Sequence, residues 1–180
     1  MIFTETAIPG AWIVDCKKLS DPRGFFARAF CAEEFAQHGL ESAFVQANLS
    51  GNKLRHTVRG MHMQAEPYGE VKVVRCTRGA VFDVFIDMRP ESPSYLKWFG
   101  AELTQDSHRM LYIPKGCAHG YQTLCDDSEV FYLVSTPYQP SSERGIRWND
   151  PFVGIEWPEM NHAVISDKDS GWPLIQPEKK

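Results

Sequence analysis

Four side chains that can exchange protons or stabilise charge lie on segments that otherwise resemble buried strands: His62, Lys72, His119 and Tyr132. Side chains alternate between the two faces of a strand, and each of the four shares its face with apolar neighbours. Singly, each has an ordinary explanation as a hydrogen-bonded histidine, a solvated lysine or a packed tyrosine. Four polar groups in one interior are costly unless a cavity uses them. Their conjunction therefore favours a functional pocket.

The residue types suit proton transfer beside a carbonyl group. A histidine such as His62 is a good general base near neutral pH. A tyrosine such as Tyr132 can act as the general acid, and the Lys72 ammonium can stabilise an oxyanion as it forms. This chemistry inverts a carbon centre through an enolate. The base also needs an orienting carboxylate, for which the C-terminal tail offers Asp167 and Asp169 without a pattern that chooses between them.

A metal site is the alternative use of the histidines. The segment "PKGCAH" (114–119) has the spacing P-x-G-x-x-H and resembles the second motif of cupin jelly-roll barrels. Metal-binding cupins resemble one another in a first motif with H-x-H, but the chain has His62-Met63-Gln64 there. Two histidines without a third strong ligand make a poor zinc or iron site. We therefore expect neither a metal nor a cofactor.

Basic and aromatic residues point to an anionic ligand with a stacking group. Arginine forks at Arg23 and Arg59 suit phosphate oxygens, and Lys168 adds a charge in the tail. Phe26 or Tyr138 could stack on a nucleobase. The alternative is that both arginines are ordinary surface charges.

Strand alternation places Arg59 on the opposite face from His62. Gly60, between them, could mark a β-bulge that rotates the chain. Alternatively, Arg59 could serve the site of a neighbouring subunit.

The scaffold that must position these residues is predicted to be all-β. Short runs rich in valine, phenylalanine and tyrosine are separated by Gly, Pro, Asp or Ser, which favours a sandwich or barrel. The predicted strands lie at 11–16, 25–30, 43–49, 57–63, 70–77, 80–88, 97–104, 109–114, 120–124 and 129–136. One helix is expected at 32–39, and the proline-rich tail after residue 137 is expected to wrap irregularly over the barrel.

Bulk properties fit one ordinary globular domain covering residues 1–180. The net charge of −4 argues against a general nucleic-acid binder. We expect neither a signal peptide nor a membrane span. Five cysteines without a C-x-x-C motif indicate a reduced, cytoplasmic protein.

Taken together, the motifs are specific. The chain resembles the dTDP-4-dehydrorhamnose 3,5-epimerase family over nearly its whole length. The segments that carry the resemblance include "DPRGFF" (21–26), "VRGMHMQ" (58–64), "YIPKGCAHGYQTL" (112–124) and "ERGIRWNDP" (143–151). The resemblance implies a cupin-like jelly-roll barrel with one or two short helices, no cofactor, and a homodimer whose subunits exchange strands.

The resemblance also implies roles for individual residues. His62 matches the general base, Asp169 its carboxylate partner, Tyr132 the general acid, Lys72 the enolate-stabilising residue and His119 a substrate contact. Further matches lie at substrate-binding positions: Arg23 and Arg59 on the diphosphate, Tyr138 stacked on thymine, and Phe26, Gln46, Asn48, Glu143 and Lys168. The implied reaction inverts C3 and C5 of a dTDP-4-dehydro-6-deoxyhexose.

The chain departs from the family pattern at several positions, of which 28 and 47 match the surroundings of the nucleoside end. Arg28 stands where the family usually has Glu, Ala47 where it has Asp, and Met63 where an aromatic is common. A CDP-linked or other NDP-linked 4-keto sugar, or epimerisation at C3 or C5 only, therefore stays open. A 3,4-ketoisomerase and a non-catalytic cupin sugar-binding module stay open as well.

Overall fold

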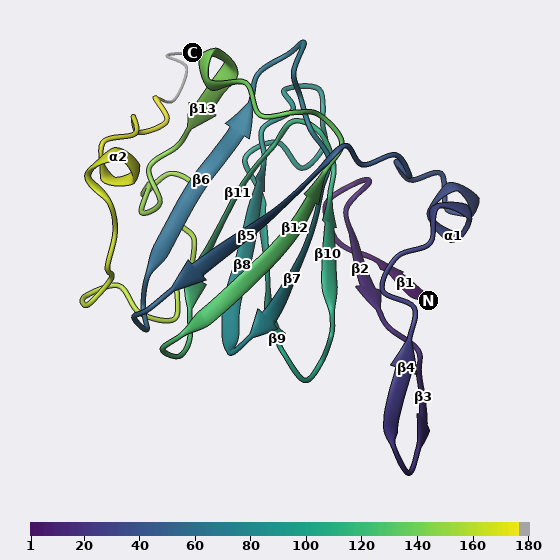
Figure 1. Ribbon diagram of the computed structural model, residues 1–180. Coiled ribbons are helices and arrows are strands. Elements are labelled where there is room, and N and C mark those ends of the chain that lie inside the picture. The colour runs from purple at the N-terminus through teal and green to yellow at the C-terminus, as the bar shows by residue number, and fades with distance from the viewer. Residues whose placement is uncertain (177–180) are drawn as a thin grey trace.

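Two antiparallel sheets face each other and form a jelly-roll barrel, as the sequence predicted (Figure 1). The computed structural model describes residues 1–176. The first sheet has six strands in the order β1 (Ile2–Glu5), β2 (Trp12–Asp15), β10 (Met110–Ile113), β7 (Lys72–Arg78), β12 (Ser128–Val134) and β5 (Gln46–Asn52). The second has five in the order β13 (Glu143–Gly145), β6 (Val58–Gln64), β11 (Cys117–Thr123), β8 (Ala80–Asp87) and β9 (Trp98–Thr104).

Every predicted strand segment overlaps a strand, and the predicted helix is present as α1 (Ala32–Gln37). The sequence reasoning missed β1, β3 (Lys18–Asp21) and β13. These strands are only three or four residues long, and β3 and β13 are largely polar, so they lack the apolar runs that marked β2, β4 (Gly24–Ala27) and β10. It also missed the 3-10 helix η1 (Pro140–Ser142) and the one-turn helix α2 (Asp167–Ser170), in a tail expected to be irregular.

The barrel interior is apolar at its centre and polar toward one end. Residues from both sheets pack in it, among them Val74 and Cys76 of β7, Phe85 of β8 and Leu111 of β10. Tyr121 of β11 closes this cluster, with Tyr132 packed against it. The interior faces of β7, β11 and β12 thus carry the apolar core and the candidate site on the same strands.

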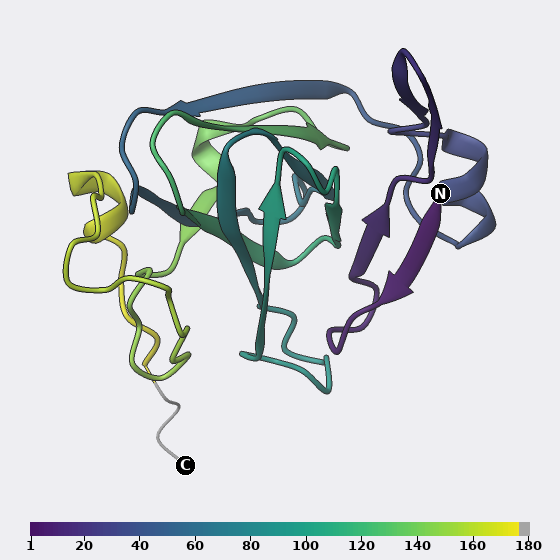
Figure 2. The same cartoon turned by 90° about the horizontal axis from the view of Figure 1, so that it is seen from below.

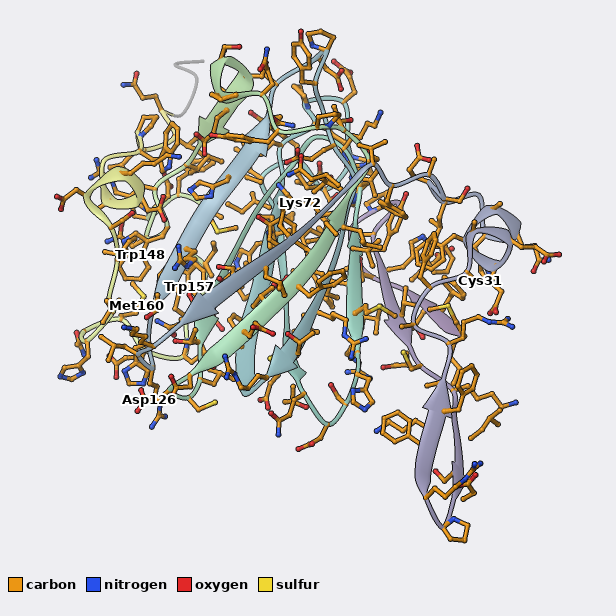
Figure 3. All side chains as sticks on the ribbon, in the orientation of Figure 1. Cys31, Lys72, Asp126, Trp148, Trp157 and Met160 are labelled. Atoms are coloured by element: carbon orange, nitrogen blue, oxygen red, sulfur yellow. The ribbon has the colours of Figure 1, made fainter. Side chains whose placement is uncertain are left out.

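Further apolar clusters cover the outer faces of the sheets. Irregular chain after β13 carries Trp148 and Trp157 (Figure 3). Both belong to the same apolar cluster as Met61 of β6, Ile86 of β8 and Ala118 of β11. Phe35 of α1 covers the outer face of the other sheet. Seen from below, the tail and the N-terminal elements lie on opposite sides of the barrel (Figure 2). Across the described residues, no helix has the length and apolar character needed to span a membrane.

Candidate active site

A histidine–aspartate pair joins β6 to the short helix α2. The Nε2 atom of His62 lies 2.6 Å from Oδ1 of Asp169, whose other carboxylate oxygen accepts the backbone N–H of Gly60 at 3.3 Å. Burial disfavours the charged carboxylate, but the hydrogen bond and charge of His62 outweigh it and lower the pKa of Asp169. The carboxylate is therefore ionised at neutral pH. Of the two candidate partners, Asp169 contacts the histidine and the exposed Asp167 does not.

The α2 turn holds this carboxylate in place. Ser166 caps the turn, because its side-chain oxygen accepts the backbone N–H of Asp169 at 3.1 Å. Such N-caps fix the start of a helix. The capping places residue 169, and not residue 167, beside β6.

A β-bulge at Gly60 resolves the conflict over Arg59. Along the β6–β11 ladder, His119 pairs with His62 but Tyr121 pairs with Arg59, so three steps on β6 match two on β11. The extra residue shifts the alternation, and Arg59 and His62 line the same cavity. Only glycine fits at position 60: its φ is +128°, and a Cβ would lie 2.6 Å from the Gly120 Cα. Strict alternation across this glycine was therefore wrong.

Lys72 and Tyr132 project from the opposite sheet. They lie on the neighbouring strands β7 and β12, with their side chains inside the barrel as strand alternation predicted. Burial, with Tyr121 and Glu70 nearby, raises the pKa of Tyr132. Its hydroxyl stays protonated at neutral pH and can give up a proton only to a basic acceptor. The Lys72 ammonium lies 2.5 Å from Oε1 of Glu70.

His119 forms a second pair, with a carboxylate that sequence reasoning missed. Its Nε2 lies 3.0 Å from both oxygens of Asp83, which is fully buried on β8. Burial raises the pKa of Asp83, and the adjacent His119 and Lys72 work against that rise. A signal existed, since alternation along β8 places Asp83 on the same face as the core residues Val81 and Phe85.

These groups line a cavity with two connected lobes. His62, Lys72 and Tyr132 line both. One lobe, about 240 Å³, also contains Arg59, His119, Asp169, Ser50 and Tyr121. The outer lobe, about 300 Å³, also contains Gln46, Asn48, Met63, Gln64, Glu70, Val134, Tyr138 and Glu143. Figure 3 shows Lys72 near the upper end of the barrel.

Hydrogen bonds order the outer lobe. Gln46 donates to the Asn48 side chain at 2.9 Å and accepts the backbone N–H of Tyr138 at 3.3 Å. The Tyr138 hydroxyl donates to Glu143 at 3.0 Å, and Lys168 donates to both oxygens of Glu143 at 2.7 Å. All five residues were singled out from the sequence, and the structure brings them to one rim. An exposed aromatic ring beside these groups can stack on a planar ligand.

Two of the expected site residues lie elsewhere. Arg23 and Phe26 are on the hairpin of β3 and β4 (Gly24–Ala27), which projects from the barrel (Figure 1). The Arg23 side chain is 89% exposed and pairs with Asp21, and Phe26 is 70% exposed. Within one chain the structure does not bring them to the cavity.

The cavity histidines lack the companions that a metal ion would need. In residues 1–176, no three His, Cys, Asp or Glu side chains are grouped as a metal site requires. The amide of Gln64 is engaged instead with Glu70 and with backbone groups. The expectation of a metal-free, cofactor-free site stays a prediction.

Fold and site define a class: a cupin-like barrel whose cavity carries a histidine–carboxylate pair facing a protonated tyrosine and a lysine, as an isomerase working by proton transfer requires. The family model described as dTDP-4-dehydrorhamnose 3,5-epimerase matches residues 5–177. The chain belongs to this family.

Individual relatives agree. The chain is 42% identical to the dTDP-4-dehydrorhamnose 3,5-epimerase of Sinorhizobium fredii, over 97% of this chain and 90% of the relative. The Bacillus anthracis dTDP-4-dehydrorhamnose 3,5-epimerase, solved with TDP and PPi bound, is 35% identical with a TM-score of 0.93, covering 97% and 99% of the two chains. The Legionella pneumophila epimerase, in complex with dTDP-4-keto-L-rhamnose, is 34% identical with a TM-score of 0.90, covering 96% and 92%.

Proposed function

We propose that the protein epimerises C3 and C5 of a dTDP-4-dehydro-6-deoxyglucose, giving dTDP-4-dehydrorhamnose. One observation carries the proposal: the candidate base His62 lies on one sheet and the candidate acid Tyr132 on the facing sheet, and both line the same cavity. A sugar ring bound between them would lose a proton from one face and gain one on the other. That exchange inverts the carbon.

The proposed steps follow from the atoms. Asp169 accepts a hydrogen bond from Nε2–H of His62, which leaves Nδ1 as the basic atom. Nδ1 takes the proton from C3 or C5, and the C–H electron pair moves to the C4 carbonyl, whose oxygen becomes an enolate held by Lys72. The pair then returns to carbon as Tyr132 donates its proton from the other side. Solvent reprotonates Tyr132 and deprotonates His62. General acid–base steps of this kind contribute about 10²–10⁴-fold each.

Charge pairing supports a place for the diphosphate. Of the basic side chains that line the described cavity, His62, Lys72 and His119 each contact a carboxylate. Arg59 instead donates to the neutral Asn52 side chain at 2.7 Å. Among residues 1–176, no carboxylate forms an ion pair with it, and a guanidinium fork suits phosphate oxygens.

We further propose a homodimer in which the projecting hairpin completes the partner's site. Leu19, Phe25 and Phe26 are exposed on this hairpin, and Val45 and Leu49 are exposed on and beside the edge strand β5. Exposed apolar groups on a projecting hairpin and at a sheet edge fit surfaces that a partner covers. In the dimer, Arg23 and Phe26 would reach the second cavity. Mixing inactive Arg23→Ala and His62→Ala subunits should then restore part of the activity, whereas a lack of recovery in mixed dimers would contradict the shared site.

The decisive experiment follows the sugar in deuterated water. Incubation with dTDP-4-keto-6-deoxyglucose should place deuterium at C3 and C5. NMR would measure the loss of the proton signals at these two carbons. His62→Ala should abolish exchange, while His162→Ala, a change at an exposed histidine outside the cavity, should not. No exchange by the wild-type protein would refute the proposal for this substrate.

The same experiment separates the competing activities. Exchange at one carbon only would indicate a single-site epimerase. Exchange with a CDP-sugar but not with the dTDP-sugar would identify a CDP-linked substrate. Migration of the carbonyl would indicate a ketoisomerase. Binding without any exchange would indicate a sugar-binding module. A reducing, cytoplasmic setting is proposed from the five free thiols, and fractionation of cells would test it.

A further inference from the structure

Glu70 is a carboxylate of the cavity for which the proposed reaction has no direct use. It lies just before β7 in the chain and lines the outer lobe. Its Oε1 accepts a hydrogen bond from the Lys72 ammonium at 2.5 Å, and the two side chains are only 9% and 10% exposed. Replacing such a pair by apolar groups is often neutral or stabilising, so fold stability does not account for it.

Gln64 fixes the other oxygen of this carboxylate. Its side-chain amide donates to Oε2 of Glu70 and to the backbone carbonyl of Tyr68 at 3.1 Å. Its carbonyl oxygen accepts the backbone N–H of Gln139 at 2.6 Å, next to Tyr138. Gln64 is nearly buried, so its rotamer is set by its surroundings. Position 64, where a metal-binding cupin would carry histidine, thus supports Glu70 and the outer rim.

We propose that Glu70 is a positioning residue that aims the Lys72 ammonium at the enolate oxygen. A lysine stem is flexible along its four carbons, and a free ammonium would sample many positions in a cavity of this size. Glu70 uses one of the three N–H donors of Lys72 and leaves the others for the substrate. Electrostatic stabilisation of a developing charge depends on donors that are already in place when the charge forms. This inference rests on the proposed function.

Glu70 could instead contact the sugar directly, and the two roles differ in their kinetics. A positioning role acts on the step that forms the enolate and passes through Lys72. A direct contact would act on substrate affinity and would not need Lys72. The kcat and KM values, together with a double-mutant cycle, separate the roles.

The experiment compares Glu70→Ala and Glu70→Gln in the wild-type and Lys72→Ala backgrounds. Glu70→Ala should lower kcat by about 10- to 100-fold, the range expected when a catalytic group is misplaced, with little change in KM. Glu70→Gln should lose less, because the amide oxygen can still accept from Nζ, although its NH₂ group replaces the oxygen that accepts from Gln64. In the Lys72→Ala background, Glu70→Ala should add less than about 2-fold. Glu129→Gln, a change in the surface pair with Arg78, should leave kcat unchanged.

A second readout separates positioning from a loss of folded protein. With substrate deuterated at C3 and C5, the isotope effect on kcat should rise in Glu70→Ala, because proton removal becomes slower. A merely structural defect would lower the melting temperature and the active fraction without changing the isotope effect. If the alanine variant fails to fold, the isotope effect on kcat and the melting temperature are measured instead for the nearly isosteric Glu70→Gln variant.

Two results would overturn the inference. In the first, the fold loss of kcat in the double variant equals the product of the losses in Glu70→Ala and Lys72→Ala. In the second, Glu70→Ala raises KM and leaves kcat unchanged. Both are read against an active wild-type protein. A wild-type protein without exchange would instead refute the proposed function.

Discussion

Replacing Asp169 by asparagine tests the proposed base more sharply than removing the side chain. The two carboxylate oxygens have different partners: Oδ1 faces Nε2 of His62 at 2.6 Å, and Oδ2 accepts the Gly60 N–H at 3.3 Å. In Asp169→Asn the amide oxygen should stay with the Gly60 donor, since an NH₂ group cannot accept there. The NH₂ group then faces Nε2, which must give up its hydrogen. The proton moves to Nδ1, the atom proposed to act as the base.

The two substitutions therefore differ in magnitude. Asp169→Ala removes one charge-assisted hydrogen bond to the imidazolium, worth about 1.5–3 kcal/mol, which corresponds to a roughly 10- to 150-fold lower kcat. Asp169→Asn adds the wrong tautomer, a defect that costs about 10⁴-fold in a histidine–aspartate pair of serine proteases. We expect asparagine to be the more damaging change, at about 10³–10⁴-fold.

The assay is turnover of the 4-keto sugar nucleotide at saturating substrate, with dTDP affinity measured separately. Affinity should change little in both variants, because neither removes a phosphate contact. Asp167→Asn is the matched control on the same turn, since its side chain is exposed and does not contact His62. The reasoning fails if Asp169→Asn keeps near-normal turnover, or if it is clearly more active than Asp169→Ala.

Three further predictions concern binding, pH and the bulge. Arg59→Ala should raise the Kd for dTDP at least about 10-fold in calorimetry, with Arg55→Ala as the neutral control, and unchanged affinity would remove Arg59 from the phosphate site. Burial raises the pKa of Cys117 to about 12, so its contribution to stability is full below its unfolded pKa near 8.5 and is lost as the pH rises toward 12. The free energy of unfolding in urea should fall between pH 7.5 and 9.5, and it should fall by about 1 kcal/mol less in Cys117→Ala than in the wild type. An equal fall in the two proteins would contradict this. Gly60→Ala should lower the free energy of unfolding by about 2–4 kcal/mol in the same assay. Gly51→Ala should be nearly neutral, because nothing lies within 4 Å of a Cβ added there. A Gly60→Ala variant as stable as the wild type would show that the bulge tolerates a side chain.

Strand alternation predicted much of the site because it is a local property of the backbone. Lys72, His119 and Tyr132 share their faces with Val74, Tyr121 and Val130, and all six lie on the inner side of the barrel. An apolar core must be filled from one face of each strand, so polar groups on that face also enter the interior.

Short elements lacked such a pattern. A strand of three residues such as β13, or a single capped turn such as α2, is held by its neighbours more than by its own periodicity. The turn matters to the site, because it decides that Asp169 reaches His62. The residue pattern offered Asp167 equally, and only the family resemblance pointed to Asp169.

By itself, the sequence determined the all-β class, the family, and the faces of the strands that carry Lys72, His119 and Tyr132. Apart from the pairings that the family resemblance implied, tertiary structure decided which groups meet. A bulge at Gly60 turned Arg59 into the cavity, and the buried carboxylates Asp83 and Glu70 became partners of His119 and Lys72. The physical reason is that alternation and propensity act over a few residues, whereas these pairs join segments that only the closure of the barrel or the path of one loop brings within hydrogen-bond distance.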